Sequence, residues 1–323
     1  MKFMLNLKRY FAALFALVLI VSASQAQHSH HDPAMSHSKG DVGVLLLAHG
    51  GQANWNEEVR RVAAEVDKKF PTEVAFGMAT KRTIQDAINK LEERGASTIV
   101  AVPLFISSKS TVITSTEYLL GSGKTAPADL AKFAKMDHGS MGHDGHASSD
   151  MLSESPAFDP TTPVTHKAVI KTVPALDADP VVAKILLDHA RSISKAPKKE
   201  VVVIVAHGPV DDAANDLWLK DMSQIANEMK AESSYKRIDY LTVRDDAPEP
   251  IRSRATEEFR SIVKRALDER SSVLIVPLLL SYGGIEEGVK KRLAGLDYTI
   301  SPQGLLPDAR IAQWVIRSVE AAH

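Results

Sequence analysis

The stretch Val201–Gly208 reads VVVIVAHG, and a closely similar stretch, DVGVLLLAHG, occupies Asp41–Gly50. Each is an apolar run of strand length that ends in Ala-His-Gly and is followed by a polar turn. A run without polar alternation is typical of a strand that is covered on both faces, as in a parallel sheet. Ligands of open parallel sheets bind beyond the carboxyl ends of the strands. The sequence therefore predicts functional positions for His49 and His207; the alternative is that each histidine only caps the following helix.

The segments around these two stretches alternate between strand and helix periodicity. Such an order is the mark of a parallel α/β unit, and its recurrence indicates an internal duplication. We therefore expect two similar α/β domains, each with a parallel sheet flanked by helices, that face each other across a cleft. The expected helices are 55–70, 81–94, 179–194, 212–230, 250–269 and 308–319, and the further strands are 73–78, 98–105, 167–172, 237–243, 272–280 and 298–301.

The first 26 residues have the pattern of a secretory signal peptide. Lys2, Lys8 and Arg9 precede a short apolar core, and Ser24-Gln25-Ala26 offers a cleavage site near Ala26. The apolar core is short for a membrane span, so we expect no stable membrane insertion after cleavage. The sequence therefore predicts a periplasmic protein, and the absence of cysteine excludes disulfides.

The remaining chain divides by composition. A polar, histidine-rich leader at 27–40 precedes the first domain, 41–194. A basic linker at 195–200 then leads to the second domain, 201–323. An insertion at about 121–165 interrupts the first domain and carries His138, His143 and His146. Imidazoles in such a segment suit a metal tether of low specificity, and a plain disordered insertion is the alternative.

The composition also excludes some functions. A net charge of −1 gives no general case for binding nucleic acid. The chain has neither a GxxxxGK[ST] nor a GxGxxG motif, so a bound nucleotide is not expected. The sequence leaves the oligomeric state open.

The chain combines two α/β halves, the Ala-His-Gly after the first strand, and the strands that contain VPLF (102–105) and VPLL (276–279). In these features it resembles the class II tetrapyrrole chelatases. The resemblance covers nearly all of the chain outside the leader segments and the insertion. It implies that a divalent metal ion, cobalt, nickel or iron, is a substrate that is inserted without ATP into a cyclic tetrapyrrole such as sirohydrochlorin.

The resemblance makes His207 the best candidate for holding the metal ion or accepting a pyrrole proton, with His49 second. The family usually has another histidine after the PLF or PLL strand, and this chain has Thr111 and Ile285 there. We expect Glu286 to replace that ligand, and the alternative is an ordinary solvated glutamate at a helix start.

Two further features of the second half fit a tetrapyrrole. Gly283 and Gly284, next to Tyr282, would let the turn approach a flat ligand. Arg244 could pair with a substrate carboxylate, or instead form an internal salt bridge with Asp245 or Asp246. Because carboxylates are concentrated here, we expect the second half to carry the site.

Two functions follow from these residues. The first is an exported metal chelatase. The second is a non-catalytic carrier of metal or tetrapyrrole on a chelatase scaffold, which the missing second histidines favour. Metal insertion in vitro discriminates between the two.

Overall fold

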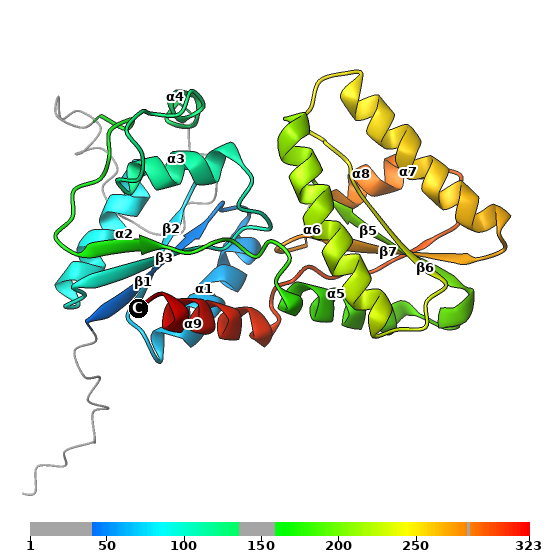
Figure 1. Ribbon diagram of the computed structural model, residues 1–323, viewed down its shortest axis with the longest axis horizontal. Coiled ribbons are helices and arrows are strands. Elements are labelled where there is room, and N and C mark those ends of the chain that lie inside the picture. The colour runs from blue at the N-terminus through cyan, green and yellow to red at the C-terminus, as the bar shows by residue number, and fades with distance from the viewer. Residues whose placement is uncertain (1–40, 136–158, 283–284) are drawn as a thin grey trace, which may run out of the picture. The chain divides into compact units, whose positions relative to one another are not determined.

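The computed structural model of the chain describes residues 41–135, 159–282 and 285–323 (Figure 1). Residues 1–40, with the predicted signal peptide and leader, residues 136–158 of the insertion, and Gly283 and Gly284 lie outside the described residues, so the expectations for them stay predictions. No helix in the described ranges combines the length and the apolar character needed to cross a membrane.

Two four-stranded parallel sheets form the framework, and they have the same strand order. The first sheet runs β2-β1-β3-β4 and the second runs β6-β5-β7-β8. In each sheet the first strand is central, and the next two strands lie on its opposite sides. The strands are β1 (Val42–Ala48), β2 (Thr72–Phe76), β3 (Thr98–Pro103), β4 (Val169–Thr172), β5 (Glu200–Ala206), β6 (Arg237–Thr242), β7 (Ser272–Leu278) and β8 (Thr299–Ile300).

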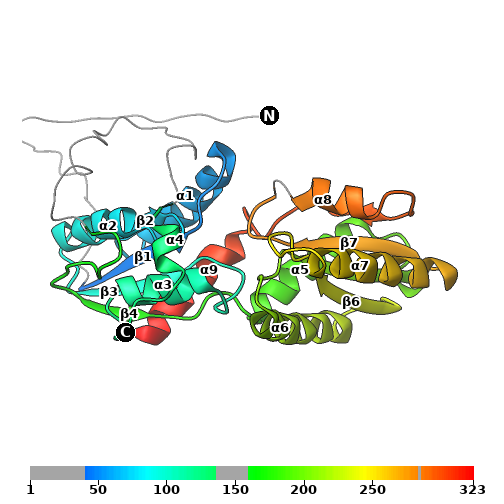
Figure 2. The same cartoon turned by 90° about the horizontal axis from the view of Figure 1, so that it is seen from above.

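Helices cover both faces of each sheet, which confirms the α/β class predicted from the apolar runs (Figure 1, Figure 2). The helices are α1 (Ala53–Asp67), α2 (Lys81–Glu93), α3 (Thr111–Leu119), α4 (Leu130–Phe133), α5 (Pro180–Ile193), α6 (Asp212–Ala231), α7 (Ile251–Asp268), α8 (Ile285–Arg292) and α9 (Ala309–Ala322). A 3₁₀ turn at Pro197–Lys199 lies in the predicted linker.

The central strand of each sheet is buried on both sides. Val202 and Ile204 of β5 belong to one apolar cluster, and Val201 and Val203 belong to another on the opposite face. This alternation follows from the period of two residues in a strand. It explains why the sequence shows a continuous apolar run and no polar alternation.

Helices α5 and α9 are exchanged between the sheets. Helix α5 follows β4 of the first sheet but packs on α6 and β7, and α9 follows β8 of the second sheet but packs on α1 and β3. Trp314 of α9 and Leu186 of α5 belong to the same buried cluster, which runs through both halves. The boundary expected at 195–200 therefore does not match the packing, because each sheet is completed by a helix from beyond that boundary.

The described flanks of the insertion expected at 121–165 contribute to the core, so a plain disordered insertion does not describe them. Helix α4 buries Leu130 and Phe133, and Val164 is buried in the same apolar cluster as the inner faces of α2 and α3.

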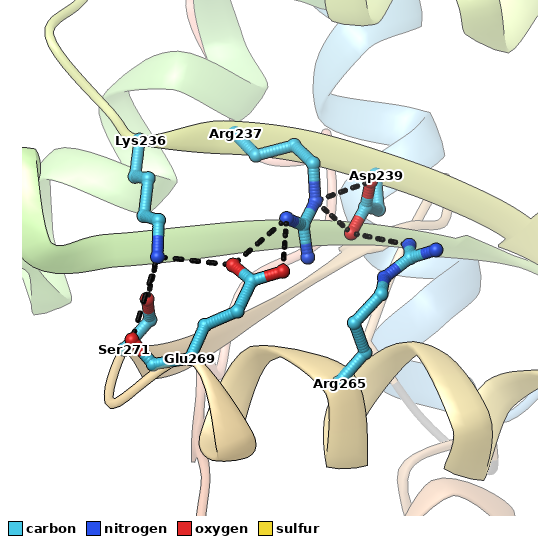
Figure 3. Close-up of polar contacts among 6 residues, drawn as sticks. All are labelled: Lys236, Arg237, Asp239, Arg265, Glu269 and Ser271. Carbon is cyan, nitrogen blue, oxygen red and sulfur yellow. Dashed lines mark hydrogen bonds and ion pairs between the residues drawn. The ribbon is translucent and has the colours of Figure 1, made fainter.

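Strand β6 is an edge strand of the second sheet, and charged side chains occupy it (Figure 3). Arg237 donates two hydrogen bonds to Asp239, at 2.8 and 3.0 Å, and two to Glu269 at 3.1 Å. Arg265 of α7 also reaches Asp239. Charges on an edge strand disfavour pairing with another chain, so this network protects the sheet edge.

Candidate metal and tetrapyrrole site

His49 follows directly on β1, and its ring orientation is fixed by the next residue. The chain turns at Gly50 with φ of +84°, a conformation that glycine adopts without strain. The Nδ1 atom of His49 lies 2.7 Å from the carbonyl oxygen of Gly50. A carbonyl can only accept, so Nδ1 donates, and the neutral ring leaves the lone pair on Nε2.

His207 repeats this arrangement at the end of β5. Its Nδ1 donates to the carbonyl oxygen of Gly208 over 2.9 Å, and Gly208 has φ of +75°. A Cβ on Gly208 would lie 2.4 Å from Cβ of Thr242, so only glycine fits against β6. In the neutral form of each ring, this hydrogen bond leaves the lone pair on Nε2, the atom that can hold a metal ion or accept a proton.

Two asparagines behind these turns were not recognised in the sequence. The amide of Asn56 accepts from the N–H of Gly51 at 2.9 Å and donates to the carbonyl of Gly51 at 3.1 Å, which holds the turn after His49. In the second half, buried Asn215 accepts a 2.6 Å hydrogen bond from Thr242. The recurrence of an asparagine in the first turn of each following helix was the available signal.

A cavity of about 450 Å³ lies at the carboxyl ends of the central strands. The turn 49–55 lines it from the first half, and His207 and residues 279–282 line it from the second half. The cavity has the size of a small-molecule site. Both strand-end histidines therefore border the same cavity.

The wall formed by residues 279–282 is fixed from two sides. Buried Ser281 donates its hydroxyl hydrogen to the carboxylate of Glu58 on α1. On the other side, Gly304 packs against the backbone of Ser281 and Tyr282. A Cβ on Gly304 would lie 2.8 Å from Cα of Ser281 and 2.9 Å from the backbone nitrogen of Tyr282, so there is no room for a side chain. Burial raises the pKa of the Tyr282 phenol, and the negative charge of Glu286 acts in the same direction.

A carboxylate stands beside the second histidine. One oxygen of Asp246 lies 3.4 Å from Nε2 of His207, and the Asp246 side chain is 75 % exposed. Asp246 follows β6, the neighbour of β5 in the sheet, so strand pairing brings the two residues together.

The structure places Glu286 differently from a solvated glutamate. Glu286 is only 5 % exposed, in the first turn of α8, and it is not among the residues that line the cavity. Its neighbour Glu287 is exposed and pairs with Lys290. The structure brings Glu286 near Tyr282 but does not place it on the cavity wall.

Arg244 does not reach the cavity, which corrects the interpretation that it binds a substrate carboxylate. Its guanidinium contacts the turn after His207, and its ion-pair partner is Asp212, at 2.6 Å. The alternative of a salt bridge with Asp245 or Asp246 is also wrong, because Asp245 pairs with Arg292 and Asp246 faces His207.

Other predicted ligands lie outside the described residues: His138, His143, His146, Gly283 and Gly284. Within the described ranges, no three histidine, aspartate or glutamate side chains gather closely enough to form a metal cage.

Comparison with known proteins places this geometry in context. Residues 43–135 match the CbiX family. The sirohydrochlorin cobaltochelatase of Methanothermobacter thermautotrophicus is 28 % identical over 160 residues, which are 49 % of this chain and 96 % of the relative. The sirohydrochlorin cobaltochelatase of Sulfolobus acidocaldarius is 41 % identical over 69 residues, 21 % of this chain and 56 % of the relative.

Solved structures share the fold. The structure of SirB from Bacillus subtilis with Fe³⁺ aligns with a TM-score of 0.56 at 16 % identity and covers 86 % of this chain and 94 % of that one. The sirohydrochlorin chelatase SirB of Bacillus subtilis subspecies spizizenii in complex with cobalt aligns with a TM-score of 0.52 at 15 % identity, with coverage of 86 % and 94 %.

Proposed function

We propose, from the match of residues 43–135 to the CbiX family and the likeness to sirohydrochlorin cobaltochelatases, that this chain is a class II tetrapyrrole chelatase that inserts a divalent metal ion into a cyclic tetrapyrrole. Cobalt, nickel and ferrous iron are the candidate ions, and sirohydrochlorin is the candidate ring. The metal ion and the ring are both substrates, and no nucleotide takes part.

The observation that supports this function best is the pair of imidazoles at one cavity. His49 and His207 both border the cavity, and each donates from Nδ1 to a glycine carbonyl, so each Nε2 carries a free lone pair. Borderline divalent ions prefer such nitrogen ligands. An ion held by one of these nitrogens keeps coordination positions for the pyrrole nitrogens, while the other nitrogen can accept protons.

The reaction balances with these groups. The metal ion replaces two pyrrole protons, and the two electron pairs of the N–H bonds become the metal–nitrogen bonds. We assign acceptance of the two protons, one after the other, to Nε2 of His207; the exposed carboxylate of Asp246 stabilises the positive charge that this ring acquires and passes each proton on to solvent. His49 holds the ion from the other side. Tyr282 supplies a ring face to the macrocycle, and Glu286 supplies negative charge behind it.

In this proposal the second half supplies most of the groups that act on the substrates. Residues 279–282 after β7 line the cavity together with His207, while the residues after β3 of the first half do not. Asp246 also belongs to the second half. For this reason we expect the loss of His207 to lower the rate of metal insertion more than the loss of His49.

We further propose that the protein works in the periplasm, on the basis of the signal-like residues 1–26. The histidines of the insertion, His138, His143 and His146, would collect metal ions for the site. Substituting all three with alanine should reduce the number of metal ions bound per chain and leave insertion from excess metal unchanged.

The decisive experiment is metal insertion into sirohydrochlorin, followed by absorbance, with Co²⁺, Ni²⁺ and Fe²⁺ in parallel. A rate above the uncatalysed rate that disappears in His207→Ala supports the chelatase. Thr111 and Ile285 stand where the family usually has its second histidine, and this observation favours a carrier. Binding of ring or metal without any acceleration of insertion would establish the carrier and reject the enzyme.

A further inference from the structure

Arg244 contacts the segment after His207 at four points. Its backbone N–H donates to the carbonyl of His207 at 2.7 Å. Its side chain donates from Nε to the carbonyl of Pro209 at 2.9 Å, from Nη2 to the carbonyl of Val210, and from Nη1 to the carboxylate of Asp212 at 2.6 Å. The planar fork of arginine can hold three acceptors in different directions at once, which an ammonium group cannot.

The burial and the backbone of Arg244 point to a specific role. The side chain is 9 % exposed, although a buried charge is costly unless its donors are used. The backbone has φ of +52°, in the left-handed region that favours glycine. Strain of this kind persists where the surrounding contacts determine it, and it concentrates at functional sites.

The two residues that follow extend the arrangement. Asp245 pairs with Arg292 of α8, and Asp246 faces Nε2 of His207 at 3.4 Å. Three consecutive side chains therefore connect the end of β6 with the turn after His207, with α8 and with the imidazole itself.

We propose that Arg244 is a positioning residue for His207: it fixes the turn 208–212 and with it the Gly208 carbonyl, so that Nδ1 stays the donor to this carbonyl and Nε2 stays directed at Asp246. This inference rests on the proposed function for its catalytic consequence. Arg244 itself touches neither substrate, so its loss affects the proton-accepting step and leaves ring binding intact.

The test compares Arg244→Lys and Arg244→Gly with a matched control, Arg252→Lys, whose arginine is exposed on α7 and pairs with Glu249. Glycine relieves the positive φ, so Arg244→Gly removes the guanidinium without adding backbone strain. The readouts are kcat and KM for sirohydrochlorin, and the ¹⁵N spectrum of the His207 imidazole, assigned by its loss in His207→Ala.

We expect both Arg244 variants to lower kcat at least tenfold with KM within twofold, and the His207 spectrum to show a mixture of tautomers. Arg252→Lys should match the unsubstituted protein in all three. A raised KM with unchanged kcat would instead make Arg244 a substrate-binding residue, and an unchanged kcat and spectrum would reject any role at the site.

Two outcomes need a separate readout. If neither Arg244 variant folds, Asp212→Asn decides, because it removes only the exposed partner of Nη1: lower kcat at constant KM supports the proposal, and an unchanged kcat overturns it. If the unsubstituted protein inserts no metal, the proposed function fails, but the tautomer of His207 in the Arg244 variants still tests the positioning role.

Discussion

Nε2 of His207 and a carboxylate oxygen of Asp246 face each other across 3.4 Å at the carboxyl ends of two paired strands. A proton taken up by this imidazole is therefore next to a negative charge, and so is a cation bound there. The exposed carboxylate gives the proton a route to solvent.

This relationship predicts unequal losses on substitution. His207→Ala should abolish metal insertion, and His49→Ala should weaken it less. Asp246→Asn should lower kcat by about tenfold, because general acid–base groups typically contribute at least that much. The control is Asp216→Asn, an exposed carboxylate on α6. Equal activity of His207→Ala and the unsubstituted protein, with loss only in His49→Ala, would assign the proton-accepting role to the first half.

Gly304 should prove necessary for the shape of the cavity. In Gly304→Ala the new methyl group would overlap backbone atoms of Ser281 and Tyr282, which cannot move as a flexible side chain would. We expect sirohydrochlorin binding to weaken at least tenfold, as measured by absorbance titration. Gly295→Ala is the control, because its Cβ would meet no atom within 4 Å and only the positive φ is strained. Similar affinities in the two variants would contradict this account of the wall.

The flanks of the histidine-rich insertion should contribute measurably to stability. Leu130→Ala and Phe133→Ala each remove a buried side chain from the core of the first sheet, and each should lower the free energy of unfolding by about 2–4 kcal/mol. Lys132→Ala, on the same short helix but exposed, is the control. Denaturant unfolding measures this difference. Unfolding curves of the two variants that coincide with the curve of the unsubstituted protein would show that α4 does not pack.

Glu200 should make stability depend on pH. Burial alone would raise its pKa, but hydrogen bonds from Ser194 and from the N–H groups of Lys195 and Ala196 hold the pKa below its ordinary value. A lowered pKa in the folded state means that the stabilisation is present above the ordinary pKa and is lost as the pH falls through the lowered one.

Glu200→Gln should therefore cost about 1–3 kcal/mol at pH 7, because hydrogen bonds to a charged group are lost. The cost should shrink as the pH falls through the folded-state pKa, where the native carboxyl is also neutral. Chemical denaturation at pH 7 and in acid measures it, with the exposed Glu257→Gln as control. A cost that is the same at both pH values would contradict the role of the charge.

The sheets could be predicted because their signal is local. The apolar run at Val201–Gly208 needs two covered faces, and β5 has them. Helix α3 was missed because Thr111–Leu119 contains several hydroxyl residues and β-branched side chains, whose intrinsic preference is not helical. Its start is fixed by the side chain of Ser110, which accepts from the N–H of Ile113.

The site was predictable only in part, for a physical reason. His49 and His207 are marked by the strand that precedes each one. The partner of Arg244 is Asp212, 32 residues away, and pairing of β5 with β6 brings the two together. Sequence proximity instead pointed to Asp245 and Asp246. The exchange of α5 and α9 is equally invisible in the local pattern, because each helix has the same amphipathic face whichever sheet it covers.

That exchange sets an order for folding during synthesis. The first sheet is covered on one face by α9, which supplies Trp314, Val315 and Val319 to the core and ends at Ala322. Helix α9 follows every strand of the second sheet in the chain, so an emerging chain has an incompletely covered apolar face on its first sheet until α9 has been synthesised. The N-terminal half therefore cannot mature as an independent co-translational unit, because its core stays incomplete until a helix from the far end of the second half has docked.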